Sequence, residues 1–174
     1  MDKRESAPHR MAQDSEKRPL ELKDFKLFRQ FSDQELSSIK QCVAEVCVKK
    51  GQKVFSTGDS GEEMFLVRRG GVRIMLPLQD GNYRHLATET QGGFFGELAF
   101  IDSDARSADV EAKCDTDLYV LSRRRFDERS RADARIGVLV FERLAKAIAL
   151  RLRDTNLQIA RAQRDHHPMS LGAG

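Results

Sequence analysis

The most informative stretch of this 174-residue sequence is Phe94-Phe95-Gly96-Glu97-Leu98-Ala99-Phe100-Ile101-Asp102-Ser103-Asp104-Ala105-Arg106-Ser107-Ala108. Gly96 has no Cβ, so the backbone there can approach a ligand closely or adopt a positive φ. If a helix begins after this glycine, the amides of Glu97, Leu98 and Ala99 are the unpaired donors of its first turn. Such a turn is a natural site for an anion.

Arg106, ten residues after Gly96, supplies the side chain that such an anion site needs. Its planar guanidinium can donate two parallel hydrogen bonds to a phosphate, which a lysine cannot do. Glu97 would repel a phosphate, but it can accept a hydrogen bond from a neighbouring hydroxyl such as a ribose 2′-OH. The stretch therefore indicates a nucleotide monophosphate site, against the alternative that Arg106 only pairs with Asp102 or Asp104 on the surface.

These residues closely resemble the phosphate-binding cassette of cyclic nucleotide-binding domains, as found in kinase regulatory subunits, catabolite activators and nucleotide-gated channels. The resemblance rests on Phe-Gly-Glu-Leu-Ala at 95–99 and Arg-Ser-Ala at 106–108, and covers roughly residues 25 to 155. It implies that Arg106 and the amides after Gly96 bind the cyclic phosphate, and that Glu97 binds the ribose. The other ligand-binding residues that it implies in the cassette are Leu98, Ala99, Ser107 and Ala108. It also implies that Ile74, Leu86 and Ala87 contact the base of the nucleotide.

The resemblance also implies the kind of function. Members of this family bind their ligand without breaking a bond, so we expect no enzyme activity, no catalytic residues and no metal or cofactor besides the ligand. The residue after the arginine is Ser107, as in the catabolite activator protein, which favours cyclic AMP over cyclic GMP. We therefore expect a regulatory sensor of cyclic AMP, with cyclic GMP as the less favoured ligand.

Composition and charge argue against several other classes of protein. The net charge of +3 does not by itself favour nucleic acid, and no apolar run approaches the ~20 residues of a membrane helix. The N-terminal residues 1–5 lack the apolar segment of a secretory signal, so we expect a cytoplasmic protein. Cys42, Cys47 and Cys114 have no metal or redox spacing and are expected to be buried, reduced thiols.

The chain is predicted to hold one domain between two tails. Residues 1–22 contain almost no large apolar side chains and are predicted to be a mobile tail, and residues 165–174 are predicted to be frayed. The ligand-binding domain is predicted over residues 23–164. Near its start, the capping box at residues 32–35 predicts a helix that carries Leu36, Ile39 and Val43 at helical spacing.

From about residue 46 to about residue 121, the apolar period is two. Val72, Ile74 and Leu76 alternate with other residues, and Asp80-Gly81 indicates a tight hairpin. Short strands with glycine turns at this density predict an antiparallel jelly-roll barrel, in a mainly β fold with flanking helices. The cassette is the one helical insertion among these strands, where binding sites are common.

Helices are predicted again over residues 123–164. The basic run at 123–125 is interpreted as an exposed helix start whose Phe126 docks on the barrel, rather than as a contact for nucleic acid or a membrane surface. The long helix that follows carries an apolar stripe formed by Phe141, Leu144, Ile148 and Leu152. This stripe predicts that the helix covers the barrel, pairs with a second protomer in a homodimer, or does both.

The sequence leaves the output of the sensor open. A transcription regulator needs a helix-turn-helix after the long helix, and the residues after Asp165 are too few for one. No DNA contact is therefore expected from this chain unless it is a fragment. A ligand-independent dimerisation scaffold is disfavoured by the presence of Gly96, Glu97 and Arg106 together. An unidentified effector would respond to the position of the helix. This effector is either a separate protein or part of a larger channel, transporter or enzyme.

Overall fold

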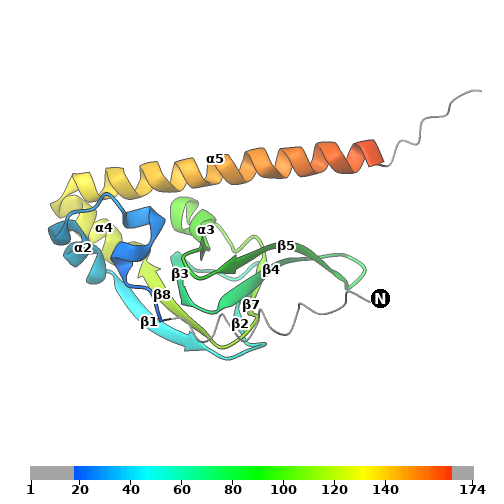
Figure 1. The fold of residues 1–174 in the computed structure, drawn as a ribbon, viewed down its shortest axis with the longest axis horizontal. Helices are drawn as coiled ribbons and strands as arrows, with labels where there is room; N and C mark the ends of the chain where they lie inside the picture. The colour runs from blue at the N-terminus through cyan, green and yellow to red at the C-terminus, as the bar shows by residue number, and fades with distance from the viewer. Residues whose placement is uncertain (1–17, 166–174) are drawn as a thin grey trace, which may run out of the picture. The chain divides into compact units, whose positions relative to one another are not determined.

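The computed structural model describes residues 18–165, in which two antiparallel β-sheets are flanked by helices (Figure 1). The chain divides after Gly137 into two compact units. The first unit contains the strands and the shorter helices, and the second consists of the greater part of α5 (Ala134–Asp165). No helix among the described residues is both long and apolar enough to cross a membrane.

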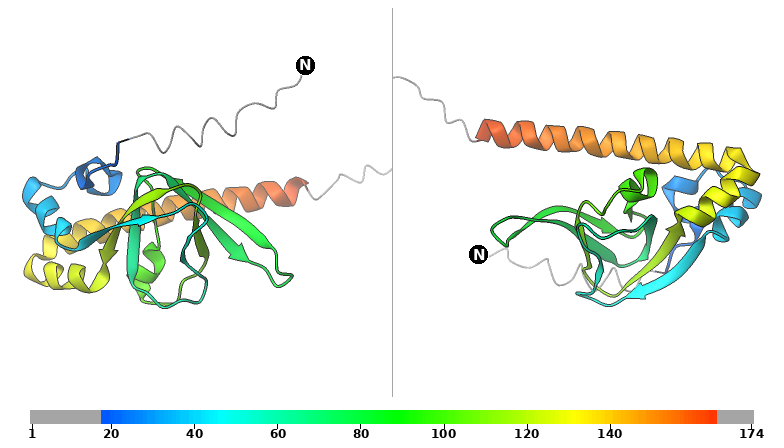
Figure 2. Two further views of the ribbon diagram at one scale, coloured as in Figure 1. Left: turned by 90° about the horizontal axis from the view of Figure 1, so that it is seen from below. Right: turned by 180° about the vertical axis from the view of Figure 1, so that it is seen from behind.

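Eight strands in the described part of the chain form two four-stranded sheets, seen from two further sides in Figure 2. The first sheet has the order β1-β8-β3-β6, with β1 (Val43–Val48), β8 (Thr116–Ser122), β3 (Glu63–Arg69) and β6 (Phe94–Phe95). The second has the order β2-β7-β4-β5, with β2 (Lys53–Phe55), β7 (Asp109–Ala112), β4 (Gly71–Pro77) and β5 (Tyr83–Thr90). The predicted fold class is confirmed, although the sheets are not closed into one barrel.

The two sheets share one hydrophobic core. Each sheet buries the apolar side chains of one face against the other sheet, as in a β-sandwich. The buried core residues come from six of the strands and are Val48, Val67, Val72, Phe95, Val110, Ala112 and Leu118. This core is the rigid support on which the helical insertion between β6 and β7 is placed.

The predicted hairpin joins β4 to β5 and is closed by backbone hydrogen bonds. The amide of Leu78 donates to the carbonyl of Asn82 at 2.8 Å, and Gly81 adopts a φ of +81°. The position of the turn is thus as the Asp80-Gly81 pair predicts.

The N-terminal helical region comprises η1 (Leu22–Asp24), η2 (Lys26–Phe28) and α2 (Asp33–Lys40). The predicted capping box is confirmed, because Glu35 N donates to Ser32 Oγ at 3.3 Å and Ser32 N donates to Glu35 Oε2 at 2.7 Å. The helix is shorter than predicted. Val43 does not continue it but begins β1, where it pairs with Leu121. Pairing with a distant strand outweighs the local helical spacing here.

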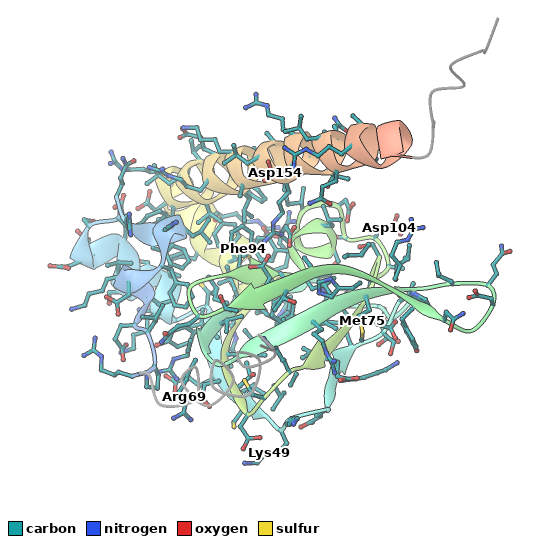
Figure 3. All side chains as sticks on the ribbon, turned by 45° about the vertical axis from the view of Figure 1, so that its right-hand side comes forward. Lys49, Arg69, Met75, Phe94, Asp104 and Asp154 are labelled. Atoms are coloured by element: carbon teal, nitrogen blue, oxygen red, sulfur yellow. The ribbon has the colours of Figure 1, made fainter. Side chains whose placement is uncertain are left out.

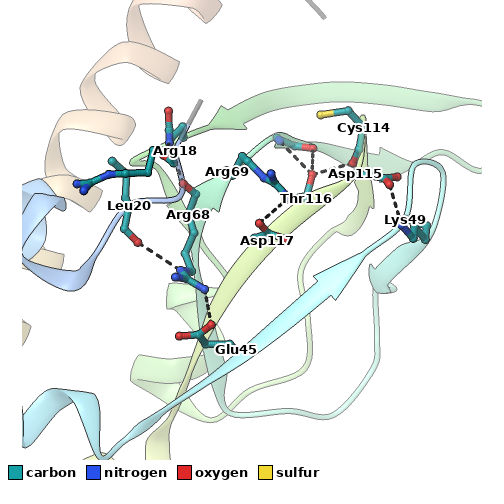
Figure 4. A network of polar contacts seen from close by, with 12 residues as sticks. Arg18, Leu20, Glu45, Lys49, Arg68, Arg69, Cys114, Asp115, Thr116 and Asp117 are labelled. Carbon is teal, nitrogen blue, oxygen red and sulfur yellow. Dashed lines mark hydrogen bonds and ion pairs between the residues drawn. The ribbon is translucent and has the colours of Figure 1, made fainter. Parts of the chain in front are cut away.

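Residues 18–22, which were expected to belong to the mobile tail, lie against β3 (Figure 4). Leu20 N donates to the carbonyl of Arg68 at 2.9 Å, and Arg68 Nε donates back to the carbonyl of Leu20 at 3.3 Å. Arg68 also donates to Glu45 at 2.5 Å and packs over the Tyr119 ring at 4.3 Å. These polar contacts hold a segment whose apolar content alone gave no sign of order. Residues 1–17 lie outside the described part.

The three cysteines differ in exposure. Cys42 is buried as expected, but Cys47 is exposed and Cys114 is partly exposed. The expectation fails for Cys47 because β1 is an edge strand, and its residues 44–47 all face solvent. Apolar neighbours in sequence therefore did not imply burial at this position.

Helix α4 (Arg123–Ala132) follows β8 directly. Its Phe126 is fully buried, as expected of a side chain that docks on the rest of the domain. In the basic run before it, Arg124 and Arg125 are exposed as expected, whereas Arg123 is partly buried. One residue, Asp133, separates α4 from α5. Residues 166–174, most of the segment predicted to be frayed, lie outside the described part.

Candidate functional site

The predicted helix start after Gly96 is helix α3 (Glu97–Asp102), which follows β6. Gly96 is its N-cap residue and has a φ of +74°, in the left-handed region that favours glycine. A Cβ on Gly96 would lie 3.0 Å from Arg106 Nη1 and 3.2 Å from the carbonyl oxygen of Glu63. This position therefore requires glycine for both its backbone angle and its lack of volume.

Arg106 lies in the segment between α3 and β7, two residues after Asp104, which Figure 3 labels. Its side chain turns inward and is only 4% exposed. Nη1 donates to the carbonyl oxygens of Glu63 at 2.7 Å and Gly96 at 3.3 Å, and Nη2 donates to Glu63 Oε2 at 3.2 Å. Nε is buried and has no hydrogen-bond partner among the described residues. A buried donor without an acceptor is costly, because it has lost its hydrogen bond to water.

The guanidinium of Arg106 rests on aromatic rings. Its central carbon lies 4.4 Å from the ring centroid of Phe55 and 5.6 Å from that of Phe65. Burial lowers the pKa of the Arg106 guanidinium, and the carboxylates of Glu63 and Asp59 act in the opposite direction. The group still carries its charge at neutral pH, because the ordinary pKa of arginine is far above 7. The site thus holds a permanent, largely desolvated cation.

The backbone of Arg106 is held by the loop between β2 and β3. Arg106 N donates to the carbonyl of Asp59 at 2.9 Å, and Gly58 N donates to the carbonyl of Arg106 at 2.8 Å. Two hydrogen bonds in opposite directions fix both the position and the direction of the chain at this residue.

Asp109, at the start of β7, anchors the same loop. Its carboxylate accepts hydrogen bonds from Lys53 Nζ at 2.7 Å and from Thr57 N at 2.8 Å and Oγ1 at 2.9 Å. The bond from Lys53 and those from Thr57 hold the pKa of Asp109 below its ordinary value. This buried carboxylate therefore supports the loop that positions Arg106, without itself touching the guanidinium.

The other predicted cassette residues divide into buried and exposed ones. Glu97 and Ala99 are buried, whereas Leu98 is exposed, and after Arg106 the exposed Ser107 precedes the buried Ala108. The amides of residues 97–99 occupy the first turn of α3, where the helix itself offers them no acceptor. The structure thus places a buried carboxylate, a set of backbone donors and a buried guanidinium around Gly96.

The predicted base-contacting residues lie on the β4–β5 hairpin. Ile74 pairs with Ala87 on one side and with Val110 on the other. The register then shifts, so that Met75 pairs with His85 and Leu86 is the extra residue of a bulge. Leu86 is 47% exposed. The structure therefore brings Ile74 and Ala87 together and leaves Leu86 outside their register.

Helix α3 is tied to α4 at its C-terminal end. Arg123 Nη1 donates to the carbonyls of Phe100 and Ile101, the latter at 3.2 Å, and Arg123 Nε pairs with Asp127 at 2.8 Å. The rings of Phe100 and Phe126 pack at 5.4 Å, and both side chains are fully buried. The last carbonyls of a helix need external donors, and here a side chain of the next helix supplies them.

Three residues of the site were not predicted: Glu63, Gly61 and Asp109. The period of two in β3 places Glu63 on the same face as Phe65, but no local pattern shows that Arg106, 43 positions away, reaches that face. A Cβ on Gly61 would lie 2.8 Å from Arg106 Nη2, so this glycine makes room for the guanidinium. Within residues 18–165, no group of three or more metal-ligating side chains is placed to hold a metal ion.

Comparison with known proteins gives a family match over the region just described. A family model for the cyclic nucleotide-binding domain matches residues 45–133. The matched range contains both sheets apart from the first residues of β1, and it also contains Glu63, the cassette and α4.

Individual relatives match over similar regions. The cyclic AMP receptor protein of Thermus thermophilus is 36% identical over 110 residues, which are 63% of this chain and 49% of that protein. A cAMP-dependent protein kinase regulatory subunit of Candida albicans is 33% identical over 91 residues, 52% of this chain and 19% of that protein. The solved structure of a cyclic nucleotide-binding domain from Methylobacillus flagellatus aligns with a TM-score of 0.72 at 25% identity, covering 86% of this chain and 80% of that one. The match thus spans about half or less of either curated relative.

Proposed function

The chain belongs to the cyclic nucleotide-binding domain family, and from this premise we propose that it is a regulatory module that binds a cyclic nucleotide at α3 and Arg106. The observation that carries the proposal is the buried guanidinium of Arg106, which is fixed beside the start of α3 and has an unsatisfied Nε. In the proposed complex, Arg106 and the first amides of α3 bind the cyclic phosphate. Glu97 accepts a hydrogen bond from the ribose 2′-OH. No bond of the ligand is broken.

The proposed ligand is cyclic AMP in preference to cyclic GMP. Ser107 is exposed directly after Arg106, and the names of the two relatives described above both refer to cyclic AMP. The base would lie against Ile74 and Ala87, and it would cover part of the exposed Leu86. Competition binding with both ligands tests this preference, and equal or stronger binding of cyclic GMP refutes it.

The proposed output is helix α5, reached through α4. Arg123 and the Phe100–Phe126 contact link the end of α3 to α4, and only Asp133 separates α4 from α5. A ligand that binds one position of α3 better than another shifts the population of molecules toward that position. Because α4 is hydrogen-bonded to the end of α3, α4 would move with it. Leu152, Leu157 and Ile159 in the distal half of α5 are each more than half exposed, which supports pairing with a second copy of the chain.

Replacement of Arg106 tests the binding site directly. We expect purified protein to bind cyclic AMP in a calorimetric titration, and Arg106→Leu to weaken the affinity at least a hundredfold. The reason is that removing the partner of a buried charge costs about 3–5 kcal/mol. Arg106→Lys is the matched variant, because it keeps the charge but loses the two-pronged geometry.

The control for this experiment is the folded state, since Arg106 also binds the carbonyls of Glu63 and Gly96. Circular dichroism must show that each variant is folded at the temperature of the titration. An unchanged isotherm for folded Arg106→Leu contradicts the assignment of the phosphate site.

A further inference from the structure

Glu63 contacts Arg106 with two different groups. Its backbone carbonyl accepts a hydrogen bond from Nη1 at 2.7 Å, and its carboxylate Oε2 accepts one from Nη2 at 3.2 Å. The carboxylate therefore occupies one of the donors that a planar guanidinium offers to an anionic ligand. In the described structure, an acidic group of the chain itself stands where part of a phosphate would bind.

The two partners of this ion pair differ sharply in exposure. The side chain of Arg106 is 4% exposed, whereas that of Glu63 is 43% exposed. The guanidinium cannot leave its position without losing the Gly96 and Glu63 carbonyls and the Phe55 ring. The carboxylate can turn toward water, where a charged group is well solvated. Glu63 is thus the partner that can be displaced.

A phosphate on Nε and Nη2 would lie within a few ångströms of the Glu63 carboxylate, and two anions at that separation repel each other. We propose that the Glu63 carboxylate is a built-in competitor of the ligand phosphate: it neutralises Arg106 in the free protein and leaves Nη2 when the nucleotide binds. This inference rests on the proposed function. It makes the Glu63 side chain a determinant of ligand affinity. The structural contact with Arg106 Nη1 comes from the backbone carbonyl of residue 63, so this contact does not require an acidic side chain there.

The contrary view is that the carboxylate orients Arg106 for the ligand. The guanidinium is already oriented by two carbonyls on Nη1 and by the aromatic ring beneath it. A third group is not needed for that purpose. The two views predict opposite signs, because loss of a competitor tightens binding and loss of an orienting group weakens it.

The test is Glu63→Gln in the full chain, titrated with cyclic AMP. We expect the dissociation constant to fall about tenfold, which corresponds to about 1.4 kcal/mol. We also expect the melting temperature of the nucleotide-free variant to fall, because a buried guanidinium loses its counterion. The matched control is Glu62→Gln, which makes the same change of charge at the exposed neighbouring residue and should leave both quantities unchanged. Should Glu63→Gln not fold, Glu63→Ala keeps the backbone carbonyl and serves in its place.

The outcomes separate this inference from the proposed function. If the natural protein binds neither cyclic AMP nor cyclic GMP, the proposed function fails and the inference falls with it. If the natural protein binds and Glu63→Gln binds equally or more weakly, only the inference is overturned, and weaker binding makes Glu63 a positioning residue. A similar gain of affinity in Glu62→Gln also overturns it, because the effect is then one of net charge.

Discussion

Burial of an arginine is costly unless its donors find acceptors, and Arg106 meets this condition only in part. The Nη atoms have two carbonyls and a carboxylate, while Nε has no partner in the described part of the chain. Two glycines, Gly61 and Gly96, lie so close to the guanidinium that a Cβ on either would approach it to 3.0 Å or less. The chain itself therefore holds the guanidinium in place. In the proposed complex, a ligand oxygen would pair with Nε, and the Glu63 carboxylate would leave Nη2.

Glu97 is the residue on which discrimination of the sugar should depend. A hydrogen bond from a hydroxyl to a charged acceptor is worth about 1.5–3 kcal/mol, so 2′-deoxy cyclic AMP should bind more weakly than cyclic AMP. Glu97→Gln should reduce the difference between the two ligands, because its amide oxygen is an uncharged acceptor. Calorimetric titration of both proteins with both ligands measures the effect. A ratio of affinities that is the same in the two proteins would show that Glu97 does not contact the ribose.

At this scale the sequence predicts what is close in the chain and misses what is distant. The backbone angle of Gly96 follows from glycine before a helix, and the chemistry of Arg106 follows from its spacing. Glu63 and Asp109 could not be found in this way. Glu63 meets Arg106 across 43 positions, and Asp109 meets Thr57 across 52 positions.

At the scale of elements, the loop between β2 and β3 links the second sheet to the cassette. It carries the carbonyl of Asp59 that accepts from Arg106 N, and it is fastened to β7 through Asp109. A buried carboxylate with three hydrogen bonds holds the loop firmly, because each hydrogen bond to a charged group contributes about 1.5–3 kcal/mol to stability. The position of Arg106 is thus set from the strand that follows it as well as from its own segment.

Asp109 should make the stability of this protein depend on pH. The pKa of Asp109 is held below its ordinary value by Lys53 first and then by Thr57. Its contribution is therefore fully present above the ordinary aspartate pKa and is lost as the pH falls through the lowered value. Asp109→Asn should lower the melting temperature at pH 7, and the difference from the natural protein should shrink in acid.

Thermal unfolding of both proteins between neutral and strongly acid pH measures this difference. Asp104→Asn, at an exposed aspartate in the segment that leads to Arg106, is the control. A difference in melting temperature that stays constant across the pH range would show that the charge of Asp109 does not stabilise the loop.

The elements themselves were predicted where their signals are local. The capping box of α2 and the Asp80-Gly81 hairpin both depend on residues within one turn or one strand end. The start of β1 at Val43 and the bulge at Leu86 depend on a partner strand instead. A bulge adds one residue to one strand, and the alternation of β5 alone does not show where that residue is.

At the scale of the whole molecule, the proposed signal would pass from α3 through α4 to α5. In the proposed complex the ligand contacts the start of α3, and Arg123 of α4 binds the carbonyls at the end of that helix. The chain then passes from α4 to α5 through Asp133 alone. The match covers about half of the Thermus thermophilus relative, so we expect the effector of the proposed output in a larger protein or a partner.

A nitroxide label at Gln158, near the end of α5, should report whether this path transmits ligand binding. We expect saturating cyclic AMP to change the mobility of the label or the distance between labels, and sedimentation to show a dimer. Arg123→Ala should retain the affinity within about threefold, as for a residue that does not touch the ligand, and should reduce the response of the label. Arg124→Ala, at the exposed neighbour of Arg123, should leave the response intact. If the ligand changes neither the mobility of the label nor the distance between labels in the natural protein, while calorimetry shows binding, α5 is not the output. If Arg123→Ala and Arg124→Ala respond alike, the link from α3 to α4 does not carry the signal.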